Sequence, residues 1–221
     1  MQVHKVGVML LGELIYKNIK VEWFGHSCFK ILTKDKIIYF DPYILPRNLQ
    51  KADIIFVTHA HYDHFAIENI RKLIKDDGVV VATNSCAPKL ANLNQKIVGP
   101  NERFEINGIA VETVPAYNMN EDFHRKADGG VGYVIIIDGV KIYHAGDTDF
   151  VPEMRKLKNI DIALLPIGGT YTMDEREAAE AANVIKPRIV VPMHFNTFNE
   201  IKKDPKEFKK LVMKDIDVKV L

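Results

Sequence analysis

Short apolar runs bounded by Gly, Pro, Asn or Asp recur along most of this chain, a pattern that is typical of β-strands. Asn107-Gly108 and Asp138-Gly139 each separate two such runs, and they predict hairpin turns because Asn or Asp before Gly tolerates positive φ. The predicted strands cover residues 21–24, 29–32, 36–40, 54–57, 79–82, 103–106, 109–114, 132–138, 140–144, 161–166 and 188–192.

Apolar residues at helical spacing interrupt the strand pattern in a few places. They predict a helix over residues 65–75, a short helix over 88–93 and an Ala-rich helix over 174–185. Thr172 and Glu175 have the spacing of a capping box, so we expect Thr172 to cap the Ala-rich helix.

A last helix is predicted near the C-terminus, with Phe208 and Leu211 turned inward. Its solvent-facing side would carry Lys202, Lys203, Lys206, Lys209 and Lys210. Mixed strands with helices at both ends of two β-rich halves predict an α/β sandwich in a single domain over residues 1–221. Residues 1–19 are expected to form an N-terminal extension, either ordered or frayed.

Composition and charge narrow the classes of partner. Lys+Arg of 30 against Asp+Glu of 29 leaves a net charge of +1, so no global field would gather nucleic acid or an anionic membrane. The apolar stretch over 6–11 is too short for a signal peptide, and no segment approaches the ~18 apolar residues of a membrane span. Cys28 and Cys86 form no metal-type spacing, and two buried thiols in a reducing cytoplasm are expected.

The run Thr-His-Ala-His-Tyr-Asp-His over residues 58–64 directly follows the buried strand predicted over 54–57. It holds three of the chain's eight histidines, with one carboxylate among them. Imidazole nitrogen and carboxylate oxygen suit a borderline divalent ion such as zinc. The run therefore predicts a metal site in the turn that leaves the strand.

Two later residues stand in the same place relative to their strands. Asp147 comes shortly after the strand over 140–144, and His194 follows the strand over 188–192. Alone, each has an ordinary explanation as a turn acid or a packed histidine. Their shared position after buried strands predicts that both join the metal site, as a two-metal hydrolase needs several such ligands.

These motifs together resemble those of the metallo-β-lactamase superfamily. The resemblance is carried by HxHxDH over 59–64, by Gly146-Asp147-Thr148 and by the late His194. The segments Trp-Phe-Gly-His-Ser-Cys-Phe over 23–29, Asp41-Pro42, Pro-Ile-Gly-Gly over 166–169 and Tyr-Thr-Met-Asp over 171–174 look like its ascorbate-6-phosphate lactonase-like branch. The similarity runs from about residue 21 to residue 195.

The resemblance implies an αββα sandwich that holds two divalent metal ions, with zinc expected and manganese or iron as alternatives. Carried over to this chain, His59 and His61 would bind the first ion. Asp63, His64 and His194 would bind the second ion, and Asp147 would bridge both. Asp63 is also the candidate catalytic residue, as a proton acceptor.

The chain departs from the family at one motif, because Asn118 stands where a histidine ligand of the first ion is expected. Asn118 could supply its carbonyl oxygen, His124 could take the vacant position, or the first site could be loose; we favour His124. The polar loop over 118–130 is expected to fold over the site. His26 would be a substrate contact or would support a ligand, and Asp41 would orient a ligand histidine through its free N–H.

The function expected from these features is metal-dependent hydrolysis, in which a metal-bound hydroxide attacks a small ester, lactone or phosphoester. Two alternatives are a phosphodiesterase or RNA-processing nuclease on the same fold, and a non-catalytic metal-binding protein. The expected partner is a small-molecule substrate, with no nucleic acid and no membrane. The oligomeric state stays open, a homo-oligomer included.

Overall fold

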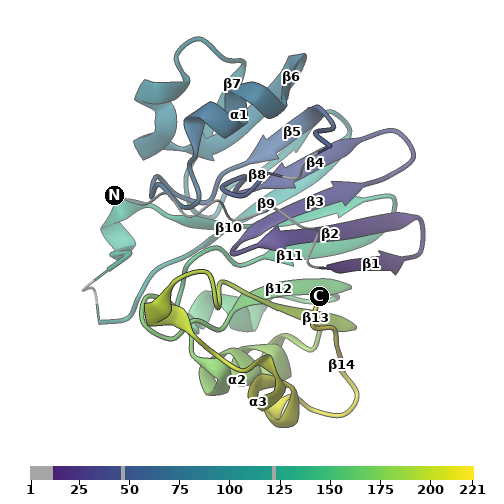
Figure 1. Cartoon of the computed structure of the whole chain (residues 1–221), viewed down its shortest axis with the longest axis vertical. Coiled ribbons are helices and arrows are strands. Elements are labelled where there is room, and N and C mark those ends of the chain that lie inside the picture. The colour runs from purple at the N-terminus through teal and green to yellow at the C-terminus, as the bar shows by residue number, and fades with distance from the viewer. Residues whose placement is uncertain (1–11, 46–47, 121–122) are drawn as a thin grey trace.

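Two seven-stranded β-sheets lie face to face, with helices outside them (Figure 1). The computed structural model describes residues 12–45, 48–120 and 123–221, so the stretch over 6–11 discussed above lies outside the described residues. The first sheet contains β1 (Gly12–Tyr16), β2 (Ile19–Gly25), β3 (Cys28–Leu32), β4 (Ile37–Phe40), β5 (Ala52–Phe56), β6 (Ile74–Thr83) and β7 (Gln95–Val98). The second contains β8 (Arg103–Ile106), β9 (Ile109–Pro115), β10 (Val131–Ile137), β11 (Val140–His144), β12 (Ile162–Pro166), β13 (Ile189–Met193) and β14 (Asp217–Val218).

Each sheet is half antiparallel and half parallel. Strands β1 to β4 pair antiparallel and β4 to β7 parallel, while β8 to β11 pair antiparallel and β11 to β14 parallel. Parallel strands need crossovers, and helical segments lie in each of these except the one from β4 to β5, whose described residues contain none. The helical segments are α1 (Ile67–Leu73), η1 (Asn84–Leu90), η2 (Lys126–Asp128), η3 (Pro152–Lys156), α2 (Glu175–Ile185), η4 (Asn199–Ile201) and α3 (Pro205–Leu211).

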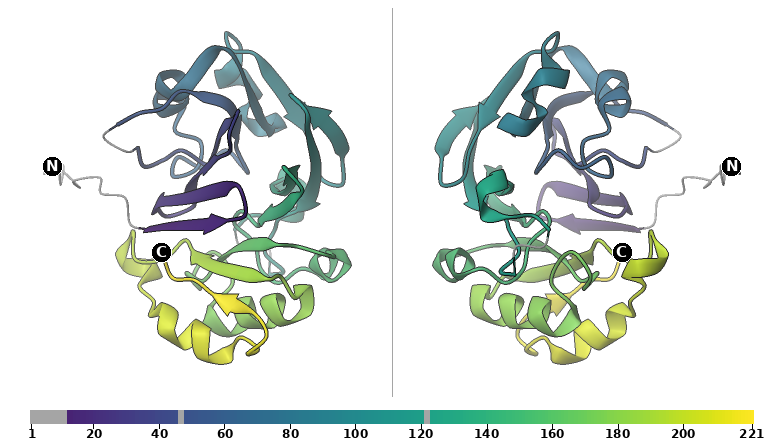
Figure 2. Two further views of the ribbon diagram at one scale, coloured as in Figure 1. Left: turned by 90° about the vertical axis from the view of Figure 1, so that its right-hand side faces the viewer. Right: turned by 90° about the vertical axis from the view of Figure 1, so that its left-hand side faces the viewer.

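The main core fills the space between the two sheets. Phe56 of the first sheet contacts Tyr133 of the second, with ring centroids 4.9 Å apart, and both side chains are fully buried. A smaller core lies under α1, where Ile70 and Leu73 pack on the outer face of the first sheet. Helices α2 and α3 pack outside the second sheet (Figure 2). The α/β sandwich predicted from the sequence is confirmed.

Most predicted elements are present, and both hairpins have the expected backbone. Asn107 and Gly108 have φ of 49° and 77°, and Asp138 and Gly139 have φ of 49° and 70°. Part of the predicted N-terminal extension is ordered, because β1 pairs with β2 along its whole length. No helix among the described residues is long and apolar enough to cross a membrane.

Three local predictions are wrong. Asp174, not Thr172, caps α2, because Asp174 Oδ1 accepts hydrogen bonds from the amides of Arg176 and Glu177, each 2.9 Å long. The helix predicted over 88–93 is the 3₁₀ segment η1, in which Pro88 lacks the amide hydrogen that an α-helix would use.

The third concerns α3, which buries Phe208 but leaves Leu211 45% exposed. Leu211 lies three positions after Phe208 and so on a neighbouring part of the same helix face, but α3 ends at Leu211, and the extended residue Val212 is buried instead.

Candidate metal centre

The polar motifs gather where chains leave the carboxyl ends of strands from both sheets. β4 leads into Asp41 and β5 into the 58–64 run, while β11 precedes Asp147 and β13 precedes His194. In α/β sheets, ligands bind in the crevice beyond the carboxyl ends of the strands. This arrangement brings the motif residues together, although the two that are farthest apart in the chain, Asp41 and His194, are separated by more than 150 positions.

Several residues around this centre have an unusual backbone. His26, Asp41, His124 and His194 have φ of 52°, 41°, 44° and 55°, in the left-handed region that few non-glycine residues adopt. Such conformations cost free energy and cluster at functional sites. The folded protein therefore holds these four side chains in place at some local cost.

Three histidines form one group at the centre. The Nδ1 atom of His61 lies 3.0 Å from Nε2 of His59 and 3.0 Å from Nε2 of His124. One nitrogen from each ring lies within 4.8 Å of the others. Nitrogens bound to one tetrahedral zinc at ~2.0–2.1 Å would lie roughly 3.3 Å apart, so these three rings have the spacing of ligands to a common ion.

Asp147 lies between this group and a second one. Its Oδ2 atom is 3.2 Å from His64 Nε2, 3.0 Å from His194 Nε2 and 3.5 Å from His124 Nε2. Asp147 is only 4% exposed. Although burial opposes ionisation, the imidazoles of His194 and His64 lower the pKa of its carboxyl well below the ordinary value. Asp147 thus carries its negative charge at neutral pH and contacts histidines of both groups.

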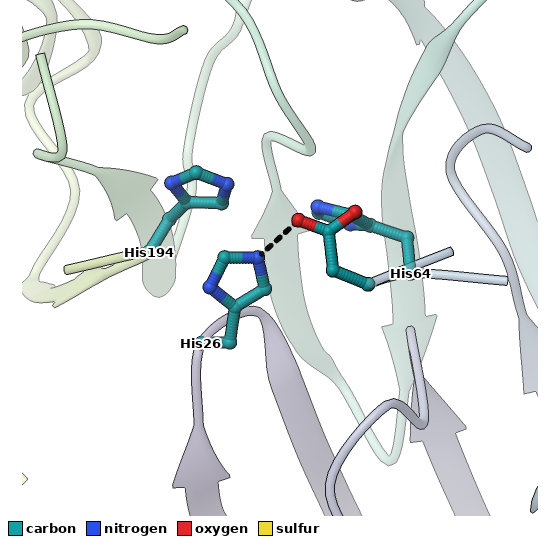
Figure 3. A group of neighbouring side chains, drawn as sticks. His26, His64 and His194 are labelled. Atoms are coloured by element: carbon teal, nitrogen blue, oxygen red, sulfur yellow. Dashed lines mark hydrogen bonds and ion pairs between the residues drawn. The ribbon is translucent and has the colours of Figure 1, made fainter. Parts of the chain in front are cut away.

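The second group contains Asp63, His64, His194 and also His26. The Nε2 atom of His26 lies 3.1 Å from Asp63 Oδ2, the contact drawn as a dashed line in Figure 3, and its ring centroid lies 4.0 Å from that of His194. Burial and the nearby His194 lower the pKa of His26 to about 4, so its imidazole is neutral near pH 7. A carboxylate only accepts, so Nε2 of His26 carries the hydrogen and donates it to Asp63.

Unpaired buried atoms test whether this centre suits a cation. Among the described residues, eight buried side-chain nitrogen or oxygen atoms form no hydrogen bond, and five of them belong to His26, His64, Asp147 and His194. Two of these five, Nε2 of His64 and Nε2 of His194, have the ion-pair contact to Asp147 Oδ2 described above, and the other three are Nδ1 of His26, Oδ1 of Asp147 and Nδ1 of His194. Each buried unpaired group costs about 1–3 kcal/mol, so a cluster of them at one spot needs a partner. Imidazole and carboxylate groups in this arrangement fit a bound divalent metal ion.

Asp41 holds His64 from the side away from the centre. Its Oδ2 lies 2.7 Å from His64 Nδ1, and Asp41 also accepts from the amide and hydroxyl of Thr58 at 2.8 and 2.7 Å. Because a carboxylate only accepts, Nδ1 of His64 carries a hydrogen and Nε2 is turned toward Asp147. Burial lowers the pKa of His64, but Asp147 and Asp41 outweigh it and raise that pKa well above the ordinary value, which reflects how strongly this spot attracts positive charge.

The residues left open by the sequence have clear positions. His124 joins His59 and His61, whereas Asn118 is 4% exposed and its side chain bonds to Asp149, to the carbonyl of Tyr171 and to His124. His144 is buried beneath the centre, where its Nε2 donates to the Ser27 carbonyl at 3.0 Å. Sequence analysis missed Asp149, although a second carboxylate two positions after Asp147 was a visible signal.

A cavity of about 350 Å³ opens beside the first histidine group. This volume is at the lower end of the range for small-molecule pockets. His59, His61, His124 and Asp147 line one part of it, and Arg125 and Asp128 line another. The second half of the predicted covering loop therefore borders the cavity through His124, Arg125, Asp128 and Gly130, while residues 121–122 lie outside the described residues.

Comparison with known proteins places these features in a family. A family model described as the β-lactamase superfamily domain matches residues 20–194. A metal-dependent hydrolase of Thermococcus onnurineus is 40% identical, covering 92% of this chain and 96% of the relative. A metal-dependent hydrolase of Thermoplasma volcanium is 37% identical, with 88% and 91% covered.

Two solved structures of similar proteins have the same fold as this chain. The metallo hydrolase Igni18 of Ignicoccus hospitalis is 32% identical with a TM-score of 0.78, over 92% of this chain and 94% of that one. A protein of Parabacteroides distasonis is 30% identical with a TM-score of 0.84, over 96% and 98%. The ascorbate-6-phosphate lactonase-like branch stays a prediction. The chain belongs to the metallo-β-lactamase superfamily and is a metal-dependent hydrolase.

Proposed function

We propose that this chain hydrolyses a small ester, lactone or phosphoester with two divalent metal ions, zinc before manganese or iron. The observation that supports this proposal is the position of Asp147, whose Oδ2 lies within 3.5 Å of histidines from both groups. The first ion would be held by His59, His61, His124 and Asp147. The second would be held by Asp147, Asp63, His64 and His194.

The metal ions, when bound, supply Lewis-acid polarisation of a carbonyl or phosphoryl oxygen and lower the pKa of water toward neutrality. The chain's own residues fix where that chemistry occurs. Asp63 is half-buried, and burial opposes its ionisation, but the hydrogen bond from His26 and the nearby His64 lower the pKa of its carboxyl. Asp63 therefore stays ionised and can take a proton from the attacking water at its free oxygen.

The surface around the centre favours a substrate with an apolar group. Tyr62, Met119 and Phe123 are 68%, 58% and 49% exposed, unusually high for large apolar side chains, and each is next to a residue of the centre in sequence. Tyr62 lies 5.9 Å from Tyr43 between ring centroids, and Phe123 lies 4.8 Å from Tyr171. Tyr43 and Phe198 also lie against the ring of His26, 6.0 and 5.4 Å between ring centroids, so aromatic side chains reach the second group of the centre. An ester or lactone with an apolar substituent fits this aromatic surface better than a highly charged substrate.

A nuclease is less well supported. Two cations near the cavity are already in ion pairs, Arg125 with Asp128 at 2.8 Å and Lys126 with Glu153 at 2.9 Å. Nucleic-acid backbones are normally bound by a continuous track of cations. The net charge of +1 on the whole chain likewise gives little support for a nucleic-acid substrate.

The test is to measure bound metal and hydrolysis on the same purified protein. Metal is quantified by elemental analysis, and turnover is followed with p-nitrophenyl esters, simple lactones and bis-p-nitrophenyl phosphate. We expect two equivalents of metal and ester or lactone turnover, with His61→Ala losing metal and at least about 10²-fold in kcat/KM. Glu105→Gln, an exposed change on β8, is the control.

Full turnover by metal-depleted His61→Ala protein would contradict the dinuclear proposal. Cleavage of the phosphodiester alone, together with salt-sensitive RNA binding, would favour the nuclease instead.

A further inference from the structure

We propose that Asn118 is a positioning residue that fixes the tautomer of His124 and thereby directs His124 Nε2 at the first metal site. This inference rests on the proposed two-metal function. It gives a role to Asn118, which stands at the position where the family resemblance implies a histidine ligand. In this chain, Asn118 would hold the ligand that has moved six positions along the loop.

The first step is the anchoring of Asp149. Its Oδ2 accepts the amide hydrogen of Met119 at 2.7 Å, and its Oδ1 accepts from Asn118 Nδ2 at 2.7 Å. The amide of Asp149 in turn donates to the carbonyl of Tyr117 at 3.0 Å. Asp149 is therefore tied to the backbone on both sides of Asn118, through its amide to Tyr117 and through its carboxylate to Met119, and the carboxylate presents an acceptor to the Asn118 side chain.

The second step is the orientation of the Asn118 amide. Its Nδ2 donates to Asp149 Oδ1 and also lies 3.1 Å from the carbonyl oxygen of Tyr171. A carboxylate and a carbonyl only accept, so the reverse orientation of the amide would set oxygen against oxygen at both contacts. Asn118 Oδ1 must therefore face the remaining neighbour, His124.

The third step is the hydrogen on His124. Its Nδ1 lies 2.9 Å from Asn118 Oδ1 and 3.1 Å from the Tyr171 carbonyl oxygen, and both are pure acceptors. Nδ1 must carry a hydrogen to pair with either. In a neutral imidazole the other nitrogen then has the lone pair, and here that atom, Nε2, is 3.0 Å from His61 Nδ1 and 3.5 Å from Asp147 Oδ2.

The backbone strengthens the same contact. The amide of Asn118 donates to the carbonyl of His124 at 2.9 Å, so the two residues are joined through both main chain and side chain. His124 is held at φ of 44°, a conformation that needs such support. Asn118 and His124 therefore act as a unit, the first anchored at the exit of β9 and the second presented to the centre.

The direct test is spectroscopic and uses metal-free, full-length protein with ¹⁵N-labelled histidine. Two-bond ¹⁵N–¹H correlations distinguish the Nδ1–H from the Nε2–H tautomer, and His124→Gln assigns the signals. We expect His124 in the Nδ1–H form, and we expect the population of that form to fall measurably in Asn118→Leu, which leaves the Tyr171 carbonyl as the one remaining acceptor of the two. An Nε2–H form of His124 in the unmodified protein would overturn the proposal, whether or not the protein hydrolyses anything.

Metal affinity gives the second readout. Asn118→Leu should weaken binding of one ion by about 10- to 100-fold and leave the other within about threefold, since partners of metal-bound histidines have effects of this size. In a His124→Ala background, Asn118→Leu should add less than about threefold, because Asn118 acts through His124. Independent, multiplicative losses in the double variant would contradict the proposal.

The matched control is Asn69→Leu. Asn69 is likewise a partly buried amide whose Nδ2 donates to two acceptors, the carbonyls of Pro42 and Tyr43, at 3.0 and 2.7 Å. Its removal should leave both the His124 tautomer and the affinity of the first ion unchanged. If Asn118→Leu does not fold, Asp149→Asn serves instead, because a second amide in place of the carboxylate frees Asn118 to reverse. An unchanged tautomer and affinity in Asp149→Asn would equally overturn the proposal.

Discussion

The residues of the metal centre are of two kinds. Some point their nitrogen or oxygen atoms toward one another, and others form hydrogen bonds that orient these side chains. Asp41, Asn118 and His26 each form a hydrogen bond to one residue of the centre, namely His64, His124 and Asp63. In each case a group of known donor or acceptor character decides which atom of the neighbour points inward. The orientation of the centre therefore depends on buried residues that would not themselves need to touch an ion.

Asp41→Asn tests this dependence at His64. The side-chain amide of the new asparagine can turn its nitrogen toward Nδ1 of His64, and it has no negative charge to balance positive charge at His64. We therefore expect about 10- to 100-fold weaker binding of the second ion. Loss of the buried bond from the Thr58 hydroxyl to Oδ2 should also lower the free energy of unfolding by roughly 1–3 kcal/mol, while the remaining oxygen still accepts from the Thr58 amide. Calorimetric metal titration and denaturant unfolding measure the two effects, with exposed Asp35→Asn as control. Unchanged affinity in Asp41→Asn would remove Asp41 from this role.

A second residue-scale prediction concerns Glu22, away from the centre. Glu22 is 8% exposed and pairs with Lys30, which is 5% exposed, across β2 and β3. Burial opposes ionisation of Glu22, but Lys30 and Lys20 outweigh it and lower its pKa below the ordinary 4.5. A lowered folded-state pKa contributes stability above 4.5 that is lost as the pH falls through the folded value.

Glu22→Gln should therefore lower the free energy of unfolding by about 1–3 kcal/mol at pH 7, because Lys30 loses its charged partner and keeps the neutral contacts to Gln50 and the Phe24 ring. The difference from the unmodified protein should shrink as the pH falls below 4.5, where Glu22 itself becomes protonated. Urea unfolding between pH 3 and pH 7 measures this, with Glu105→Gln as control. A difference that stays constant over this range would mean that charge at Glu22 is not the cause.

At the scale of elements, the strands inside the two sheets and the edge strand β8 were predictable, whereas the edge strands β1, β7 and β14 were not. Buried strands such as β12 are apolar throughout, whereas β7 has only Val98 buried and β14 is two residues long, so neither of the last two has a pattern that predicts a strand. The cap of α2 was misassigned because Thr172 and Asp174 are both good caps, and only the fold selects Asp174.

The sequence likewise predicted only part of the metal centre. His59, His61, Asp63, His64, Asp147 and His194 could be expected to meet because each follows a strand. The path of the loop after β9 has no periodicity, so the sequence could not decide between Asn118 and His124. That choice depends on hydrogen bonds to Asp149 and Tyr171, which are distant in sequence.

Gly168 tests how tightly the loop after β12 supports His194. A Cβ atom at Gly168 would lie 2.5 Å from the His194 carbonyl oxygen and 3.0 Å from its Nδ1. Gly168→Ala should therefore displace His194 and weaken binding of the second ion, at a stability cost of roughly 1–3 kcal/mol. Gly108→Ala is the control, because it has φ of 77° and open space around its Cβ, so it should cost about 1 kcal/mol without any change in metal affinity. Equal metal affinities in the two variants would contradict this account.

At the scale of the whole molecule, the centre joins the two sheets. His59, His61, Asp63 and His64 follow the first sheet, whereas His124, Asp147 and His194 follow strands of the second. Contacts such as His64 to Asp147 therefore cross from one half of the sandwich to the other. Ions bound here would link the two sheets at the edge of the sandwich where the covering loop lies. This link would add to the apolar core that already holds the sheets together.

Metal removal should therefore lower the thermal stability of the entire fold. A ligand present at about 1,000 times its Kd stabilises the folded state by about 4 kcal/mol. For a chain of this length that corresponds to a melting temperature about 8–16 °C higher than for metal-free protein. Calorimetric scans before and after chelation measure the shift, and readdition of zinc should restore it. His194→Ala, which removes a ligand from the second sheet, should show a smaller shift than the unmodified protein. A melting temperature that does not respond to chelation, although elemental analysis finds the metal gone, would mean that the ions do not link the two sheets.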